Sequence, residues 1–302
     1  MRTMTQNREA VRSSLHQRAG GLGWVARLTG SLALLATVAV GGSAHAGPKD
    51  FIIYTPGLGG DAEQAKPYID KFAQFIDAAV GWPKGSAKGT FLSSRKEAVA
   101  ALDSAKPGFG VMEASLYLEI RAAHKAEVIA QVDSDELNSP RLHVVVKNPA
   151  YKSLADLAGK KLWTTMADSP KYLGYVVLDG KGPAETRFAL KSVGVFSKGV
   201  RAVLRGEADA TLVNDQQLEA AKKMEGGGEL RSIYDSPQLP NLVVVTLDGS
   251  LPAPQAQKLE KTLLGMCSEA SGAEICKEMH IRRFVTKNTA VLGAAQKQFE
   301  HP

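Results

Sequence analysis

Short apolar runs alternate along the chain with segments whose apolar residues recur at helical spacing. Residues 51–55 (Phe-Ile-Ile-Tyr-Thr) form the first run and end at a proline- and glycine-rich turn, after which Ile69, Phe72 and Ile76 recur every three or four residues. The same alternation continues through the next predicted elements, which are strands at 90–92, 109–112 and 127–132 and helices after Ser93 or Ser94 and at 114–125. Such a series predicts a parallel sheet with helices on both faces.

Two strongly β-branched runs, residues 141–147 and 242–246, bracket a second α/β series of about a hundred residues. A series inserted between two such runs indicates a discontinuous, two-lobed α/β protein. We therefore expect the two runs to lie side by side as the crossing strands of a hinge. The predicted division assigns 47–145 with 242–302 to lobe one and 146–241 to lobe two.

Residues 1–46 have the order of a secretory signal peptide. A leader with five arginines precedes a thirteen-residue apolar run, 28–40, and Ala44-His45-Ala46 supplies small residues for cleavage. An uncleaved membrane anchor is the alternative, but a spanning helix needs about 20 apolar residues. We therefore expect cleavage before Gly47 and a periplasmic protein, with either Met1 or Met4 as the start.

Charge and cysteine content narrow the class of protein further. Removing the five arginines and one glutamate of the leader lowers the net charge from +6 to about +2, so nucleic acid is not an expected partner. Cys267 and Cys276 are the only cysteines, and in an oxidising compartment we expect them to form a disulfide rather than remain buried thiols. They form no zinc pattern, because His280 is the only histidine near them.

No sequence motif for a catalytic or cofactor-binding site occurs in the chain. There is no Gly-x-Ser-x-Gly, His-Glu-x-x-His or Walker sequence, and the glycines at 57–60 do not have the spacing of a dinucleotide fingerprint. We therefore expect no catalytic residue, cofactor or metal. The alternative is an exported enzyme with the same fold, in which Glu113 or Asp215 acts as a base.

Hydroxyls and backbone amides at predicted helix starts make up the candidate ligand site, because such groups suit anions. Each of these serines also has a simpler interpretation as a helix cap. Glu113 and Asp215 follow strands and could face the same crevice, at the carboxyl ends of the strands, where they would suit a cationic or amine-bearing ligand instead. Each also has a simpler interpretation as a solvated loop carboxylate. The full candidate set is Thr55, Gly57, Ser93, Ser94, Glu113, Ser115, Thr164, Thr165, Ser169, Asn214 and Asp215.

Four segments carry a resemblance to a known family. Residues 153–164 and 203–213 resemble parts of the second lobe of type II periplasmic binding proteins, and 93–102 with 108–112 are similar to the phosphate, phosphite and phosphonate branch. The resemblance implies a monomeric receptor that captures a small polar anion, similar to phosphate or phosphonate, for an ABC-type transporter permease. Where that branch carries a Ser/Thr-Ser-Gly run, this chain has Ala-Asp-Ser-Pro-Lys at 167–171.

One further alternative remains open at this point. An envelope protein with the same fold could bind a protein partner instead of a solute. Its contact face would be the predicted helical segment 258–277, in which lysines and glutamates are mixed.

Overall fold

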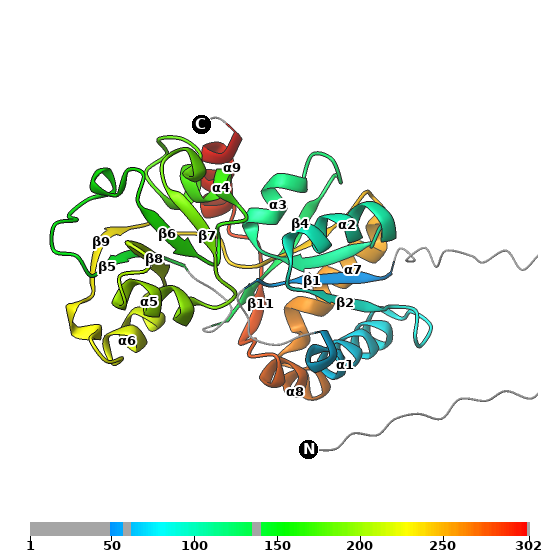
Figure 1. The fold of residues 1–302 in the computed structure, drawn as a ribbon. Helices are drawn as coiled ribbons and strands as arrows, with labels where there is room; N and C mark the ends of the chain where they lie inside the picture. The colour runs from blue at the N-terminus through cyan, green and yellow to red at the C-terminus, as the bar shows by residue number, and fades with distance from the viewer. Residues whose placement is uncertain (1–48, 57–61, 135–139, 301–302) are drawn as a thin grey trace, which may run out of the picture. The chain divides into compact units, whose positions relative to one another are not determined.

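The computed structural model describes residues 49–56, 62–134 and 140–300 (Figure 1). The predicted signal peptide therefore lies outside the described residues. Within the described ranges no helix is both long and apolar enough to span a bilayer.

Six strands form the first sheet, in the order β11-β4-β10-β3-β1-β2. Strands β2, β1 and β3 are parallel to one another, whereas β10 runs antiparallel to β3 and β4, and β11 antiparallel to β4. Their bounds are β1 Phe51–Tyr54, β2 Gly89–Leu92, β3 Phe109–Met112, β4 Glu127–Asp133, β10 Val243–Thr246 and β11 Arg283–Val285.

Five strands form the second sheet, in the order β7-β6-β8-β5-β9. Strands β7, β6 and β8 are parallel, and β5 runs antiparallel to its neighbours β8 and β9. Their bounds are β5 His143–Val146, β6 Lys161–Thr164, β7 Ala189–Ser192, β8 Ala210–Val213 and β9 Arg231–Asp235. We call the two sheets, each with the helices that follow its strands, the first and second lobe. Each sheet contains the predicted parallel strands, but both sheets are mixed, because antiparallel strands pair beside them.

The two β-branched runs are strands, but they do not pair with each other. Strand β10 lies in the six-stranded sheet and β5 in the five-stranded sheet, each buried along its whole length. The predicted placement of residues 142–145 in lobe one is therefore wrong. A run that is buried on both faces fits the middle of either sheet, so its composition does not identify its partner strands.

The chain passes between the sheets through two neighbouring segments that precede β5 and follow β9. The Ser236 amide donates to the Leu142 carbonyl over 2.8 Å, and the Leu142 amide donates to the Ser236 hydroxyl over 2.9 Å. The Leu239 amide donates to the Pro140 carbonyl over 2.8 Å. These two segments, rather than the β-branched runs, connect the lobes side by side.

Helices follow most of the strands, as the alternation predicts. The helical elements are α1 Ala62–Val80, α2 Arg95–Ala105, α3 Ala114–Ile120, η1 Leu154–Leu157, α4 Pro170–Tyr172, η2 Leu173–Val177, η3 Ala184–Thr186, α5 Phe196–Leu204, α6 Asp215–Lys222, η4 Gly227–Glu229, α7 Ala253–Met266, α8 Ala270–Glu278 and α9 Thr289–Glu300. In β1, Phe51 and Ile53 pack in one hydrophobic cluster and Ile52 and Tyr54 in another, so both faces of this strand are buried.

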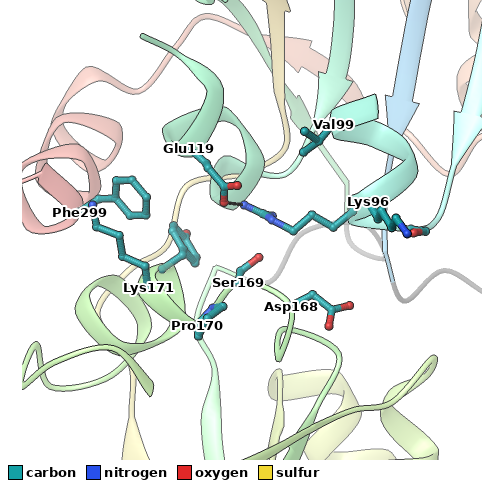
Figure 2. Close-up of a pocket in the computed structure, with 11 residues that line it drawn as sticks. Lys96, Val99, Glu119, Asp168, Ser169, Pro170, Lys171 and Phe299 are labelled. Carbon is teal, nitrogen blue, oxygen red and sulfur yellow. Dashed lines mark hydrogen bonds and ion pairs between the residues drawn. The ribbon is translucent and has the colours of Figure 1, made fainter. Parts of the chain in front are cut away.

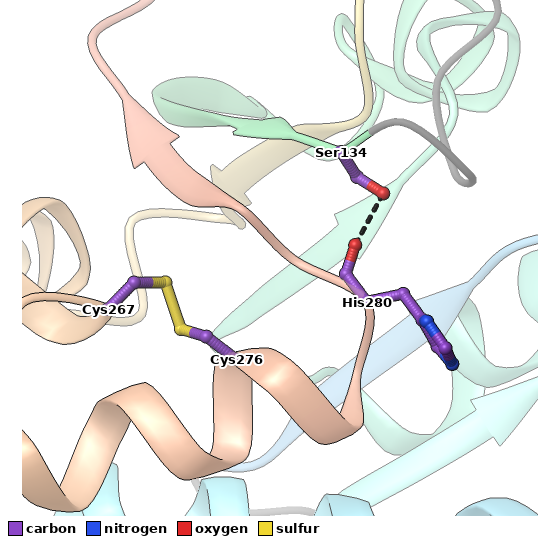
Figure 3. The surroundings of a disulfide bond; sticks show 4 residues. All are labelled: Ser134, Cys267, Cys276 and His280. Atoms are coloured by element: carbon purple, nitrogen blue, oxygen red, sulfur yellow. Dashed lines mark hydrogen bonds between the residues drawn. A yellow bond between two sulfur atoms is a disulfide. The ribbon is translucent and has the colours of Figure 1, made fainter.

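A disulfide joins Cys267, directly after α7, to Cys276 of α8, as the sequence predicts (Figure 3). Beside it the Ser134 hydroxyl donates to the His280 carbonyl over 2.6 Å, which ties the residue after β4 to the end of α8 (Figure 3). Closing a loop of this length stabilises a fold by about 2–3 kcal/mol, mainly by restricting the unfolded chain.

Candidate ligand-binding site

A cavity of about 700 Å³ has walls from both lobes and from the C-terminal helix (Figure 2). The start of α2 and one residue of α3 form the wall from the first lobe. The segment that opens α4 forms the wall from the second lobe, and α9 contributes Phe299. The lining residues are Ser94, Arg95, Lys96, Val99, Glu119, Asp168, Ser169, Pro170, Lys171, Tyr172 and Phe299.

Arg95 is the most deeply buried cation of this wall, with 9% of its surface exposed. Its Nη2 donates to the Ser115 carbonyl over 3.3 Å and to the Glu119 carboxylate. Its Nη1 is buried and has no hydrogen-bond partner among the described residues. The Ser115 carbonyl and the Glu119 carboxylate therefore hold the guanidinium through Nη2, at the wall of the cavity.

Ser94 caps α2, because its hydroxyl accepts the Glu97 amide over 3.5 Å. The simpler interpretation of this serine as a cap is therefore confirmed, although the residue also lies on the cavity wall. The first turn of this helix still supplies amides with a favourable dipole beside Arg95.

The wall from the second lobe carries both charges and a buried tyrosine. Asp168 is exposed and accepts a hydrogen bond from the Ser192 hydroxyl over 3.3 Å, whereas Ser169 is buried. The Lys171 ammonium lies 4.2 Å from the centre of the Phe299 ring. Burial, together with the charge of Glu113, raises the pKa of Tyr172, so its hydroxyl stays protonated.

A polar cluster lies next to the cavity, at the carboxyl ends of β1 and β3. It contains Tyr54, Thr55, Glu113 and Ser115, and Arg95 contacts it through the Ser115 carbonyl. The Thr55 hydroxyl is buried without a hydrogen-bond partner among the described residues. Burial raises the pKa of Tyr54 to about 12, and the charge of Glu113 adds to the effect.

Glu113 is the titratable group of this cluster. Burial raises its pKa to about 7, against the opposing effects of a 3.2 Å hydrogen bond from the Ser115 hydroxyl and of the Arg95 charge. A carboxyl with this pKa is partly protonated at neutral pH, so it can donate as well as accept a hydrogen bond.

The predicted site residues divide into four groups. Ser94 and Ser169 lie on the cavity wall, and Thr55, Glu113 and Ser115 form the adjoining cluster. Gly57 lies outside the described residues. The remaining candidates, Ser93, Thr164, Thr165, Asn214 and Asp215, are not among the residues that line this cavity.

Three of those remaining candidates have local partners. The Thr164 hydroxyl accepts the Met166 amide over 3.2 Å, and Asn214 caps α6 by accepting the Gln217 amide over 2.8 Å. Asp215 Oδ1 lies 2.8 Å from His143 Nε2. These interactions hold the second lobe together, so the groups are less available to a ligand than their positions after strands suggested.

The sequence interpretation missed Arg95, Lys96, Lys171, Tyr172 and Phe299. Arg95 carried one usable signal, because a cation in the first turn of a helix is opposed by the helix dipole and needs a compensating contact. Phe299 carried no such signal in the sequence. Its place at the cavity depends on the packing of the C-terminal helix against elements that are distant in the sequence.

The described residues contain no cluster of three or more His, Cys, Asp and Glu side chains suited to a metal ion. Arg95, Lys96 and Lys171 face two carboxylates, Glu119 and Asp168, around the cavity. The site is thus one of mixed charge, in which its most buried charged group is a cation.

Comparison with known proteins gives the same fold. A search of the curated proteins found no match. Among solved structures, XAC2383 from Xanthomonas citri bound to ATP is 15% identical, with a TM-score of 0.64 over 83% of this chain and 97% of that chain. PhnD1 from Prochlorococcus marinus in complex with methylphosphonate is 16% identical, with a TM-score of 0.59 over 83% and 97%.

A third structure, a binding protein component of an ABC phosphonate transporter from Pseudomonas aeruginosa, is 16% identical, with a TM-score of 0.57 over 83% of this chain and 87% of that chain. At such identities the likeness shows the two-lobed fold alone. The family described as "ABC transporter, phosphonate, periplasmic substrate-binding protein" matches residues 60–291, which is most of the chain. The chain therefore belongs to the family of periplasmic substrate-binding proteins of phosphonate ABC transporters.

Proposed function

We propose that this protein is exported, captures a small phosphorus oxyanion in the cavity between its lobes, and delivers it to a membrane permease. The observation that carries the proposal is Arg95, the most deeply buried cation among the residues that line the cavity. Burying a charge is costly unless it has partners of opposite charge, and a bound oxyanion adds such a partner to the existing contact with Glu119.

The groups around Arg95 suit such a ligand. The first turn of α2 offers amides, Thr55 offers a buried hydroxyl without a partner among the described residues, and Ser169 and Tyr172 add hydroxyls from the second lobe. Each charge-assisted hydrogen bond contributes about 1.5–3 kcal/mol. Four or five of them would support a micromolar Kd after the cost of association.

Two structural neighbours support the choice of anion. PhnD1 is in complex with methylphosphonate and XAC2383 is bound to ATP, and both ligands present phosphorus oxygens. Glu113 does not argue against an anion, because a pKa of about 7 lets it carry a proton when the anion binds.

Titration calorimetry with methylphosphonate tests the proposal through an Arg95→Met variant. Loss of a buried charge partner should weaken binding at least about 30-fold. Arg205→Met, which removes an exposed arginine that does not line the cavity, is the matched control and should leave Kd unchanged. Equal affinities for wild type and Arg95→Met, with both proteins folded by circular dichroism, would contradict the proposed site.

The proposal also includes the export route and the mature state. We expect the mature protein to begin at Gly47, to be a monomer and to retain the Cys267–Cys276 bond. Intact mass of the protein purified from the envelope tests the cleavage, because a retained leader would add the mass of residues 1–46. Size-exclusion chromatography with light scattering measures the oligomeric state.

A further inference from the structure

The C-terminal helix α9 contacts both lobes. Its chain comes from β11, an edge strand of the six-stranded sheet, yet α9 packs against α3 of the first lobe and η2 of the second. Leu292 and Ala295 are buried in this packing, and Arg121 Nη1 lies 2.8 Å from Glu300 Oε1 at the end of the helix. These contacts fix the last turn of α9 beside the cavity.

Phe299 lies in that last turn and brings its ring to the cavity wall. Only 7% of its surface is exposed, and the Lys171 ammonium of the second lobe lies 4.2 Å from the ring centre. Figure 2 shows Phe299 and Lys171 together on one side of the cavity, with Asp168 and Lys96 on the other. A residue from the end of the chain thus contacts a cation of the opposite lobe.

A lysine on an open wall binds an anion more tightly when its ammonium is already restricted to a position at the cavity. The side chain has four flexible methylene bonds, and an unrestrained ammonium spends most of its time in solvent. Contact with an aromatic face increases the population of a cation at that position about 2–5-fold when the contact is exposed to solvent. The increase is larger when the contact is desolvated. Lys171 is exposed overall, so the ring is the contact that restricts its ammonium.

We propose that Phe299 is a positioning residue, which holds the Lys171 ammonium at the cavity so that Lys171 contacts the bound anion. This inference rests on the proposed function, since it requires an anionic ligand. On this inference α9 contributes to ligand binding as well as to the packing of the two lobes. Lys171 is then the contribution of the second lobe to charge recognition, opposite Arg95 of the first lobe.

A double-mutant cycle on ligand affinity tests the coupling. Lys171→Met should weaken methylphosphonate binding about tenfold, because a charge-assisted contact is lost. Phe299→Leu keeps apolar volume but removes the ring, and should weaken binding about 2–5-fold. In the Lys171→Met background Phe299→Leu should cause no further loss, because its effect acts through the ammonium.

Two further variants separate positioning from packing. Phe299→Trp keeps an aromatic face and should retain wild-type affinity or improve it. Phe188→Leu is the matched control, because the Arg187 guanidinium lies 5.0 Å from the Phe188 ring centre and neither residue lines the cavity. It should leave Kd unchanged even if the melting temperature falls.

A measurement without ligand tests the contact itself. In the nuclear magnetic resonance spectrum of the wild-type protein, the ε protons of Lys171 should show an upfield ring-current shift that disappears in Phe299→Leu. Absence of that shift, or equal effects of Phe299→Leu with and without Lys171, would overturn the inference while methylphosphonate binding stands. A protein that shows the shift but binds no oxyanion would overturn the proposed function, and the role of Lys171 with it.

Discussion

Two buried polar groups next to the cavity, the Thr55 hydroxyl and Arg95 Nη1, have no hydrogen-bond partner among the described residues. Most buried polar atoms in folded proteins are paired, so an exception calls for an explanation. Arg95 lines the cavity, and Thr55 directly follows β1 in the polar cluster that Arg95 contacts. The proposed function predicts that an anionic ligand interacts with both residues.

Thr55→Val separates this explanation from a packing defect. The substitution keeps the shape of the side chain and removes the unpaired hydroxyl, so the free protein should be as stable as wild type or slightly more stable. If the hydroxyl contacts the ligand, Kd for methylphosphonate should rise about 3–10-fold, which corresponds to the loss of one hydrogen bond. Thermal melting and calorimetry measure the two effects, and an unchanged Kd would exclude Thr55 from the site.

Glu113 predicts a pH dependence of binding. Its pKa is raised to about 7, so it is protonated and neutral below that value and repels an anion above it. Anion affinity of the wild-type protein should fall as pH rises from 6 to 8. This fall should be about tenfold larger than the change in affinity of Glu113→Gln over the same pH range. The ionisation of the ligand is common to both proteins, so the ratio of their Kd values isolates the effect of Glu113. A ratio that does not change with pH would show that Glu113 does not face the anion.

Single residues were partly predictable from the sequence. Ser94 and Ser169 line the cavity, and the sequence pointed to them because hydroxyls before helices are visible in the pattern. Asp215 does not line this cavity, and its carboxylate instead contacts His143, seventy-two residues away, a partner that no local pattern indicates. Which partner a polar group takes depends on the folded chain.

Three elements of the second lobe meet at His143. This histidine opens β5, and its Nδ1 lies 2.7 Å from Asp235 Oδ1 at the end of β9, while its Nε2 lies 2.8 Å from Asp215 Oδ1 at the start of α6. Burial alone would lower the pKa of His143, but the hydrogen bonds with Asp235 and Asp215 outweigh it and raise the pKa. The bond from His143 is also the main cause that lowers the pKa of Asp235.

These shifts predict where the contacts stabilise the fold. A raised histidine pKa gives stability that is complete below the ordinary value of about 6.5 and is lost as pH rises through the folded value. A lowered aspartate pKa gives stability that is present above about 3.9 and is lost at lower pH. The contribution should therefore be largest between about pH 4 and 6.5.

His143→Gln tests this window by thermal melting. Because both aspartates are largely exposed, the two pairs are worth little individually, and the variant should melt roughly 2–5 °C below wild type at pH 5.5. The difference should shrink as pH rises above 7. A difference that is constant from pH 5 to 8 would mean that the histidine acts by packing alone.

The sequence predicted the secondary-structure elements better than it predicted the site residues or the strand pairing. The apolar runs became β1, β3, β5 and β10 with bounds close to those predicted, because strands buried on both faces read as continuous apolar sequence. The helix predicted at 114–125 ends at Ile120, since residues 121–125 form turns and Lys125 has a positive φ of 43°. Helix ends depend on such local backbone turns, which periodicity does not record.

At the scale of the whole molecule, the two sheets share one arrangement. Each has three parallel strands followed by an antiparallel strand, which is β10 beside β3 in one sheet and β5 beside β8 in the other. The two β-branched runs therefore occupy equivalent positions in the two sheets. The sequence predicted two lobes correctly from these runs but paired the runs with each other, because it does not specify which distant strand each one joins.

The segments between the sheets explain why the site could be located only approximately from the sequence. The cavity takes residues from α2, α3, the start of α4 and α9, which lie far apart in the chain. Their meeting depends on the hydrogen-bonded segments at 140–142 and 236–239 and on the packing of α9 across both lobes. Such long-range placement leaves no periodic mark in the sequence.

Native mass spectrometry of the intact protein tests the central claim most directly. The mature protein would be incubated with an equimolar mixture of methylphosphonate, phosphate, glutamate and putrescine. The account predicts a single 1:1 complex whose added mass is that of a phosphorus oxyanion, and its loss in Arg95→Met. A complex with putrescine alone, or no complex with any member of the mixture, would contradict it.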